Sequence, residues 1–539
     1  MKKRILLLVL LSYISLSIVG NSTGDMYRVW LSDKKGSEYT IQQPEKFLSQ
    51  RCLDKRARYN IDVDASDLPV SADYIEQLKS KGCSIVVTSR WMNTAVVSTT
   101  DSMVIVSITK LPFVTKVERV KSASARSVAI ATPMPADGLY SSNAAPCATA
   151  AHSAFYGDSW QQIQMLNLDS LHLEGYYGEG VMIAVLDAGF PKIDVHPYIN
   201  NSRIKGAYNF PQGRFSYSGG NNHGSSVLSC MASYIPGRYI GAAPEADYWL
   251  IVTEDYTCEV AVEEDYWAAG VEMADSIGVD IINSSLGYNT YDNPENDYTH
   301  DDLDGKTAFC SRVATLAAQK GLLVVSAAGN EYSTDWQKIN VPSDAVGIMT
   351  VGSVNSDSTH SIFSSCGYTA DGRVKPEVMA MGKGTRVIDH NGEIQYINGT
   401  SFSTPLISGA MACLWQTHPE WTAQELIDRV VKSASQYNRP DELYGYGIPN
   451  FYSVYRNSAS VGHINASRQQ LYVSGRMLYL PSLDEPATIA VYDTAGRMVM
   501  KTTVNPQDNT LNMQHLDRGI YIVYMQSRGE RVACKVSIE

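Results

Sequence analysis

The stretch "VMIAVLD", residues 181–187, decides the fold because it is an unbroken apolar run that ends in a carboxylate. Short runs of this kind are typical of strands that are buried on both faces of a parallel sheet. Four similar runs follow along the chain. They are "DYWLIVT", "VDIINSSLG", "LLVVSAAGN" and "GIMTVGSV", which begin at residues 247, 279, 322 and 347.

Helical stretches separate some of these runs. "VAVEEDYWAAGVEMADSIG" (residues 260–278) and "TAFCSRVATLAAQKG" (residues 307–321) are the clearest. Alternation of strands and helices predicts an α/β fold in which helices flank a mostly parallel sheet. We expect this domain to span residues 159–457.

Three further segments have a different character. Residues 25–120 mix β-rich pieces with helical ones, such as "PVSADYIEQLKSKG" ending at Gly82, and predict a small α+β module. Residues 121–158 are rich in Ser, Ala, Pro and Gly and predict a linker or processing segment. Residues 463–539 contain two hairpin-like stretches with period-two alternation and predict a small β-sandwich.

The first residues predict export. Lys2, Lys3 and Arg4 precede an apolar run of about 15 residues and then small residues, which is the pattern of a secretory signal peptide, residues 1–20. No second apolar run is long enough to span a membrane, so we expect no transmembrane span in the mature chain and a secreted or cell-surface location. The net charge of −12 argues against a nucleic-acid partner.

The nine cysteines include no CxxC pair, so the spacing of a zinc site is absent. Export permits disulfides, but their pairing cannot be deduced from the sequence.

Four polar residues lie where the predicted strands and helices begin or end. Asp187 and Asn330 each end a strand, His223 opens a small-residue helix, and Ser401 stands at a helix start in "INGTSFSTPLISGAMACLW". Each has an ordinary structural explanation, such as turn formation or helix capping. In open α/β sheets, however, sites gather at the carboxyl ends of the strands.

The residues around Ser401 favour a nucleophile. Gly399 permits a sharp turn, and we expect Pro405 to be tolerated because the first helical N–H groups lack partners anyway. Ser401 then lies near the positive end of the helix dipole, where its own N–H and the Asn330 amide could form an oxyanion hole.

The order Asp, His, Asn, Ser resembles the subtilisin-like serine peptidases (the S8 family) over about 300 residues. The matching segments are "VLDAGF", "HGSSVLS", "SSLG", "SAAGN" and "NGTSFSTP". Two departures stand out: Ala188 replaces the usual Ser or Thr after the Asp, and Ser225 and Ser226 replace Thr-His. They put the fine orientation of Asp187 in doubt.

The resemblance implies roles for these residues. Ser401 would be the nucleophile, His223 the general base and Asp187 its orienting acid, with Asn330 stabilising the oxyanion. Six residues would lie along a peptide substrate: Ser285, Leu286, Gly287, Ala327, Ala328 and Gly329. No cofactor is required for the chemistry.

Structural calcium is possible, since many members of the family use it. Asp301, Asp302 and Asp304 are weak candidates for its ligands, and a solvated turn explains them as well.

The resemblance extends to the flanks. The α+β module resembles the inhibitory propeptide of these peptidases, and the C-terminal β-sandwich resembles the sorting domain of type IX secretion substrates, as in "VYDTAGRMVMK". The expected partners are therefore protein or peptide substrates, the chain's own propeptide and the secretion machinery.

We expect a secreted serine endopeptidase. The alternative is a catalytically weak surface adhesin or scaffold on a peptidase fold. An α/β-hydrolase esterase is disfavoured, because "GTSFS" lacks the second Gly of G-x-S-x-G and the order of the triad residues is reversed. A sedolisin-type peptidase would carry Glu in place of His223.

Overall fold

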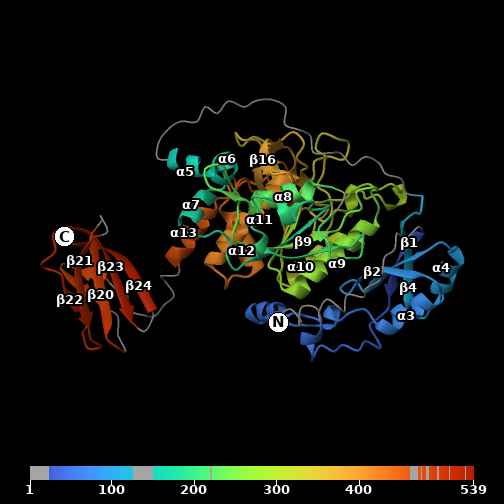
Figure 1. Ribbon diagram of the computed structural model, residues 1–539, viewed down its shortest axis with the longest axis horizontal. Coiled ribbons are helices and arrows are strands. Elements are labelled where there is room, and N and C mark those ends of the chain that lie inside the picture. The colour runs from blue at the N-terminus through green and yellow to red at the C-terminus, as the bar shows by residue number, and fades with distance from the viewer. Residues whose placement is uncertain are drawn as a thin grey trace. The chain divides into compact units, whose positions relative to one another are not determined.

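The computed structural model describes residues 24–124, 150–218, 221–461 and 472–538, the last range with gaps at 475, 481–484, 494–496, 509 and 528–529. The predicted signal peptide and residues 125–149 of the predicted linker lie outside these ranges. The chain divides into two units, Met1–Arg456 and Asn457–Glu539, which we describe separately (Figure 1).

The predicted parallel sheet is present in the first unit. Among the described residues it has seven strands in the order β15-β12-β11-β10-β5-β9-β6, and every neighbouring pair is parallel. The bounds are β5 Met182–Asp187, β6 Ile204–Asn209, β9 Asp247–Val252, β10 Ile281–Ser284, β11 Leu323–Ala327, β12 Met349–Val354 and β15 Val378–Met381.

Five of these strands coincide with the five apolar runs, whereas the two edge strands were not foreseen. β6 reads "IKGAYN" and is polar enough to resemble a loop, and β15 has only four residues. β6 is only partly buried, so its sequence carries a weak apolar signal, whereas β15 is fully buried and apolar but too short to stand out as a strand.

Two helical layers cover the sheet. Along β5, Ile183 and Val185 join one apolar core, while Ala184 and Leu186 join the other. The first core includes residues of α8 (His223–Ala232) and α11 (Thr400–Thr417), and the second those of α9 (Val262–Ile277) and α10 (Phe309–Gln319). Burial on both faces explains why the central strands are continuously apolar.

The order of the strands places a switch point at β5. The chain leaves β5 toward β6 and β9 on one side, and it returns to β10 on the other. In open α/β sheets the crevice at such a point, outside the carboxyl ends of the strands, is where ligands bind. Asp187 ends β5, and Ser285 directly follows β10.

The N-terminal module has the predicted α+β character. Its antiparallel sheet has the order β2-β3-β1-β4, with β1 Asp25–Leu31, β2 Ser84–Ser89, β3 Thr94–Thr99 and β4 Val114–Lys121. Helices α3 (Ala72–Ser80) and α4 (Ser102–Ile108) complete it. The side chain of Ser71 caps α3, and Gly82 follows its end with a positive φ of 99°.

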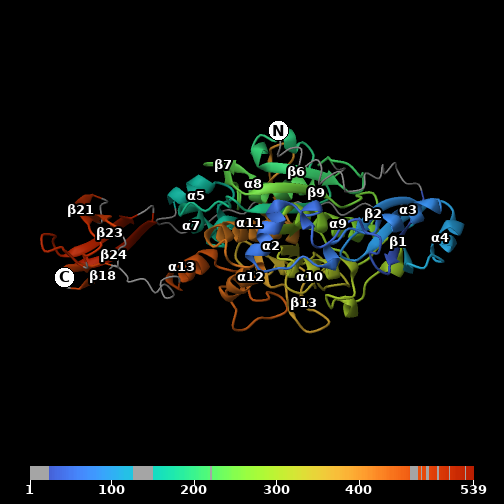
Figure 2. The same cartoon turned by 90° about the horizontal axis from the view of Figure 1, so that it is seen from below.

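The module packs on the outer side of α9 and α10. Met26, Trp91 and Val96 belong to the same apolar core as those helices. Arg28 forms a buried ion pair with Asp265 of α9, at 2.7 Å. A separate helix of the module, α2 (Gln50–Arg58), also lies against α9 (Figure 2).

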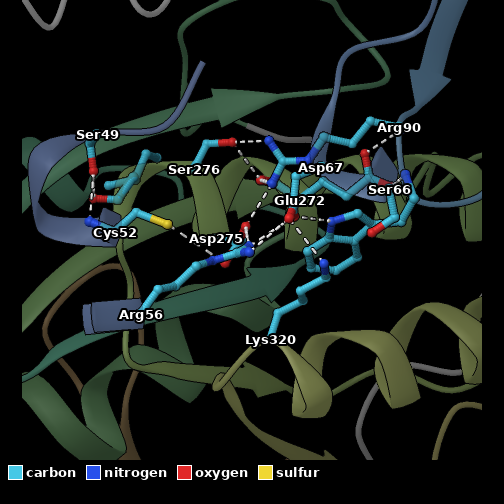
Figure 3. Close-up of polar contacts among 12 residues, drawn as sticks. Ser49, Cys52, Arg56, Ser66, Asp67, Arg90, Glu272, Asp275, Ser276 and Lys320 are labelled. Atoms are coloured by element: carbon cyan, nitrogen blue, oxygen red, sulfur yellow. Dashed lines mark hydrogen bonds and ion pairs between the residues drawn. The ribbon is translucent and has the colours of Figure 1, made fainter. Parts of the chain in front are cut away.

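A buried charge cluster joins α2 to the part of the first unit that contains the parallel sheet, called here the peptidase-like domain (Figure 3). Arg56 binds both Asp67 and Asp275, each at 2.8 Å, and Arg90 binds Asp275 at 2.7 Å. Lys320 reaches Asp67 at 3.0 Å. Because Asp275 and Lys320 belong to the peptidase-like domain and the other members to the module, the cluster holds the two together.

The second unit is a pair of antiparallel sheets, as predicted. One has the order β18-β19-β22 and the other β21-β20-β23-β24. Their bounds are β18 Tyr472–Ser474, β19 Met477–Tyr479, β20 Ala487–Asp493, β21 Met498–Val504, β22 Thr510–Asn512, β23 Gly519–Ser527 and β24 Glu530–Ile538. Both hairpin-like stretches of the sequence form hairpins, β20–β21 and β23–β24.

One segment differs from expectation in its structure. Helix α5, Ala150–Tyr156, lies inside the range that we expected to be a linker. Phe155 contacts the apolar core and Tyr156 is buried in it, so the end of this range is anchored to the domain that follows.

The charge cluster predicts a stability effect. Asp275→Asn removes the carboxylate that Arg56 and Arg90 share, so it should lower the free energy of unfolding of the uncleaved chain by about 3–5 kcal/mol. Chemical denaturation of the full chain, with the predicted nucleophile replaced in a Ser401→Ala background, would measure this. Asp54→Asn is the matched control, because Asp54 is exposed on α2. An equal effect of the two substitutions would contradict the prediction.

Candidate active site

Asp187 and His223 meet at the carboxyl end of β5. His223 Nδ1 lies 2.8 Å from Asp187 Oδ1, and the Asp187 side chain is completely buried. Oδ1 also accepts the backbone N–H of Ala188 at 2.7 Å. A buried carboxylate needs such donors, and its bond fixes the proton of the imidazole on Nδ1.

A glycine lets the helix of His223 approach this closely. A Cβ on Gly224 would lie 2.6 Å from the carbonyl oxygen of Gly189 and 2.7 Å from the ring of Phe190. Both residues belong to the loop that directly follows Asp187. The small residue after His223 therefore brings the start of α8 against the end of β5.

The departure at position 188 has a visible consequence. Asp187 Oδ2 is buried and has no hydrogen-bond partner among the described residues. Ala188 has no hydroxyl to offer it. The substitution at position 188 therefore affects only Asp187 Oδ2, while Oδ1 keeps its hydrogen bond to His223.

Ser401 is the second residue of α11, as predicted. Gly399 precedes the helix with a φ of 148°, a conformation that favours glycine. The first turn of a helix has backbone N–H groups without helical partners, so the Ser401 N–H is available to a ligand.

Pro405 does not fit the reason that we gave for it. It lies inside α11 rather than in its first turn, so it removes the N–H that would have bonded the carbonyl of Ser401. The Ser285 hydroxyl takes that place and donates to Ser401 O at 2.8 Å. The proline therefore ties the start of α11 to the residue after β10.

Ser401 and Ser285 are linked a second time. The Ser401 hydroxyl donates to Ser285 O at 3.2 Å. No hydrogen bond between Ser401 Oγ and His223 Nε2 occurs among the described contacts. Catalytic hydrogen bonds are often made only when substrate is bound, so this arrangement is compatible with a nucleophile at rest.

Thr400 orients Asn330, and the sequence analysis missed this role. The Thr400 N–H donates to Asn330 Oδ1 at 2.9 Å, and the Thr400 hydroxyl lies 3.1 Å from the same atom. With its oxygen held in this way, the amide of Asn330 presents its Nδ2 donors to other groups. The signal in the sequence was the hydroxyl residue immediately before Ser401.

The predicted substrate segments differ in what their backbones offer. Tyr288 exchanges backbone hydrogen bonds with Val341, but no backbone hydrogen bond engages Leu286 or Gly287 among the described residues. Ala328 and Gly329 already bond to other parts of the protein through their backbones. Among the described residues, Leu286 and Gly287 thus keep unpaired backbone groups, whereas the backbones of Ala328 and Gly329 are already bonded.

Two of the three calcium candidates are occupied by local contacts. Asp302 accepts the N–H and hydroxyl of Thr299, and Asp304 accepts the N–H groups of Lys306 and Thr307. No cluster of three or more His, Cys, Asp or Glu side chains suited to a metal ion occurs among the described residues. Asp301, Asp302 and Asp304 thus do not fit a calcium site.

Electrostatics adapt His223 to proton transfer. Burial disfavours the imidazolium, but the neighbouring Asp187 carboxylate outweighs burial and raises the pKa of His223 above its usual 6.5. An imidazole whose charged form is stabilised by a carboxylate is suited to accept a proton and return it.

The ring of His223 lies 5.5 Å, centroid to centroid, from that of Phe402, the residue after Ser401, so the Asp–His pair and the start of α11 lie in one region at the carboxyl edge of the parallel sheet. This arrangement is typical of serine hydrolases with an α/β fold. A model of the subtilase family matches residues 178–447. Subtilisin E of Bacillus subtilis (strain 168) is 31% identical over 303 residues, which cover 56% of this chain and 71% of subtilisin E.

Other relatives agree. Subtilisin of Bacillus pumilus is also 31% identical, over 56% of this chain and 98% of that protein. Subtilisin Savinase of Lederbergia lenta is 27% identical over 53% of this chain and 95% of its own length. The chain therefore belongs to the subtilase family, and it is a subtilisin-like serine peptidase.

The flanking segments match family models as well. Residues 26–133 match the Peptidase S8 propeptide domain of Bacteroidota, and residues 468–539 match a secretion system C-terminal sorting domain. The propeptide and the sorting domain expected from the sequence are thus confirmed. In the part of the chain that the structure describes, no helix has the length and apolar character needed to cross a membrane.

The pKa of His223 predicts the pH dependence of activity. Only neutral His223 can accept a proton, so kcat/KM should fall as pH decreases through a midpoint above 6.5. In Asp187→Asn the carboxylate is lost and burial dominates, so the midpoint should move down while kcat falls about 10⁴-fold. Rates with a peptide substrate across neutral pH would measure both. A wild-type midpoint at or below 6.5 would contradict this account.

Proposed function

We propose that this protein hydrolyses peptide bonds in proteins through Asp187, His223 and Ser401. The observation that carries the proposal is the 2.8 Å bond from His223 Nδ1 to buried Asp187, with the His223 ring 5.5 Å from that of Phe402, the residue after Ser401 in α11. These residues come from three separate elements, β5, α8 and α11, and the His223 contacts with Asp187 and with Phe402 support their meeting at one sheet edge.

The chemistry follows from the geometry. Ser401 Oγ leaves the carbonyl of Ser285 and attacks the scissile carbonyl carbon, while His223 Nε2 takes its proton. Asp187 stabilises the imidazolium, which then protonates the leaving amine as the C–N bond breaks. A water molecule hydrolyses the acyl-enzyme by the same proton path in reverse.

The oxyanion would bind to Asn330 and the start of α11. Asn330 Nδ2 and the Ser401 N–H are the proposed donors, and Thr400 holds the Asn330 oxygen so that Nδ2 is presented. Loss of one such donor costs about 10²- to 10³-fold in kcat.

The substrate would bind as an added strand. The free backbone of Leu286 and Gly287 supports pairing with an extended peptide, with Ala327, Ala328 and Gly329 forming a wall beside it. Binding through backbone groups places few demands on sequence, as befits a protein-degrading enzyme.

We also propose how the flanks serve the enzyme. The propeptide, predicted to span residues 25–120, would assist folding and block the cleft until the segment 121–158 is cut. The signal peptide would direct export, and the C-terminal domain, predicted at residues 463–539, would engage the type IX secretion machinery. The end point is secretion or the cell surface.

Labelling with a serine-reactive fluorophosphonate tests the central proposal. Processed wild-type protein should be labelled and should digest casein, and Ser401→Ala should lose both because the nucleophile is absent. Ser403→Ala, two residues along the same helix, is the matched control and should keep both activities. Unlabelled, inactive wild type with its propeptide removed would instead support a surface scaffold on a peptidase fold.

A further inference from the structure

Glu331 directly follows Asn330, and its carboxylate collects three hydrogen bonds on one oxygen. Glu331 Oε2 accepts the backbone N–H of Asn330 at 2.5 Å, Asn340 Nδ2 at 3.0 Å and Ser365 Oγ at 3.0 Å. The three donors come from three different segments of chain. No ion pair to Glu331 occurs among the described residues, so its partners there are neutral donors.

Two of these donors, Asn340 and Ser365, are themselves hydrogen-bonded to the segment that carries Asn330. The Asn340 N–H donates to the carbonyl of Ala328 at 3.0 Å, and the Ser365 N–H donates to that of Gly329 at 3.0 Å. The Ser365 hydroxyl also accepts the N–H of Glu331 at 2.9 Å. The carboxylate is therefore the centre of a closed network around residues 328–331.

The network is also connected to the proposed substrate strand. Asn289 Nδ2 donates to Asn340 Oδ1 at 3.3 Å, and the neighbouring Tyr288 pairs with Val341 through the backbone. Asn340 thus connects the loop of Asn330, through hydrogen bonds, to the segment that follows Gly287.

The carboxylate of Glu331 is tightly packed against the backbone of Gly329. Gly329 has a φ of 110°, and a Cβ there would lie 2.5 Å from Glu331 Oε2, 2.8 Å from Ser365 Oγ and 2.9 Å from Asn340 Nδ2. Burial raises the pKa of Glu331, which is opposed by the hydrogen bonds from Ser365, Asn330 and Asn340. The side chain is thus held by its donors rather than by solvent.

We propose that Glu331 is a positioning residue for the oxyanion site, acting through Asn330. This inference rests on the function proposed above. Thr400 holds the side chain of Asn330, and Glu331 holds its backbone, so together they set where the amide points. A loss of this setting should appear in kcat rather than KM, because the oxyanion develops only in the transition state.

The role of Glu331 is geometric and not one of charge. A negative charge close to a developing oxyanion disfavours it, so the carboxylate contributes as an acceptor of fixed donors. Glu331→Gln keeps an acceptor oxygen in nearly the same place and should retain kcat within about threefold. Glu331→Ala removes the acceptor and should lower kcat about 10- to 50-fold with little change in KM.

A double-mutant cycle with Asn330→Ala tests the mechanism on the processed enzyme. If Glu331 acts through Asn330, Glu331→Ala should cost less than about threefold once Asn330 is already alanine. The full loss persisting in that background, or a loss confined to KM, would overturn the proposal. Glu393→Ala is the matched control and should leave both constants unchanged, because Glu393 is an exposed carboxylate in the turn between β16 (Thr385–Ile388) and β17 (Ile394–Ile397).

Ser365→Ala covers the case in which Glu331→Ala does not fold. It removes one donor of three and should lower kcat several-fold, again only when Asn330 is present. An equal loss in both backgrounds would refute the coupling. A failure of the proposed function is distinguishable, because it would appear as activity that survives Ser401→Ala or as an Asn330→Ala enzyme with normal kcat.

Discussion

A completely buried carboxylate at the end of β5 is the constraint on which the site depends. Asp187 lies where a strand covered by helices on both faces reaches the sheet edge, so water cannot satisfy it. His223 and the N–H of Ala188 satisfy its Oδ1 instead. The need for a donor fixes where α8 begins, and the absent side chain of Gly224 lets that helix come close enough.

The second fixed point is the pair of hydrogen bonds between Ser285 and Ser401. Pro405 frees the carbonyl of Ser401 from the helix, and the Ser285 hydroxyl takes it. In return the Ser401 hydroxyl rests on the carbonyl of Ser285. Ser285 begins the proposed substrate strand, and it is bonded to Ser401, the proposed nucleophile. These bonds therefore set the position of the scissile bond relative to the atom that attacks it.

The sequence predicted most of this architecture because its signals were local. Central strands, helices and strand-end polar residues each follow from a run of residues and its neighbours. What it could not predict depends on tertiary contact. The β6 edge has a weak apolar pattern and β15 is only four residues long. The role of Pro405 depends on Ser285, which follows a distant strand, and the role of Thr400 depends on its contact with Asn330. The unpartnered oxygen of Asp187 likewise emerges only when all neighbours are placed.

Apolar and ionic contacts make different contributions to the docking of the N-terminal module on the peptidase domain. Met26, Trp91 and Val96 extend the core of the peptidase domain, and such contacts supply attraction without direction. Arg28 with Asp265 and Arg56 with Asp275 are paired at defined atoms, so they specify one docking orientation. In the proposed maturation these carboxylates return to water when the module leaves. The surface that the module had covered then carries charged side chains of α9 and is not purely apolar. Such a surface is compatible with an exported enzyme, because a large exposed apolar patch favours aggregation.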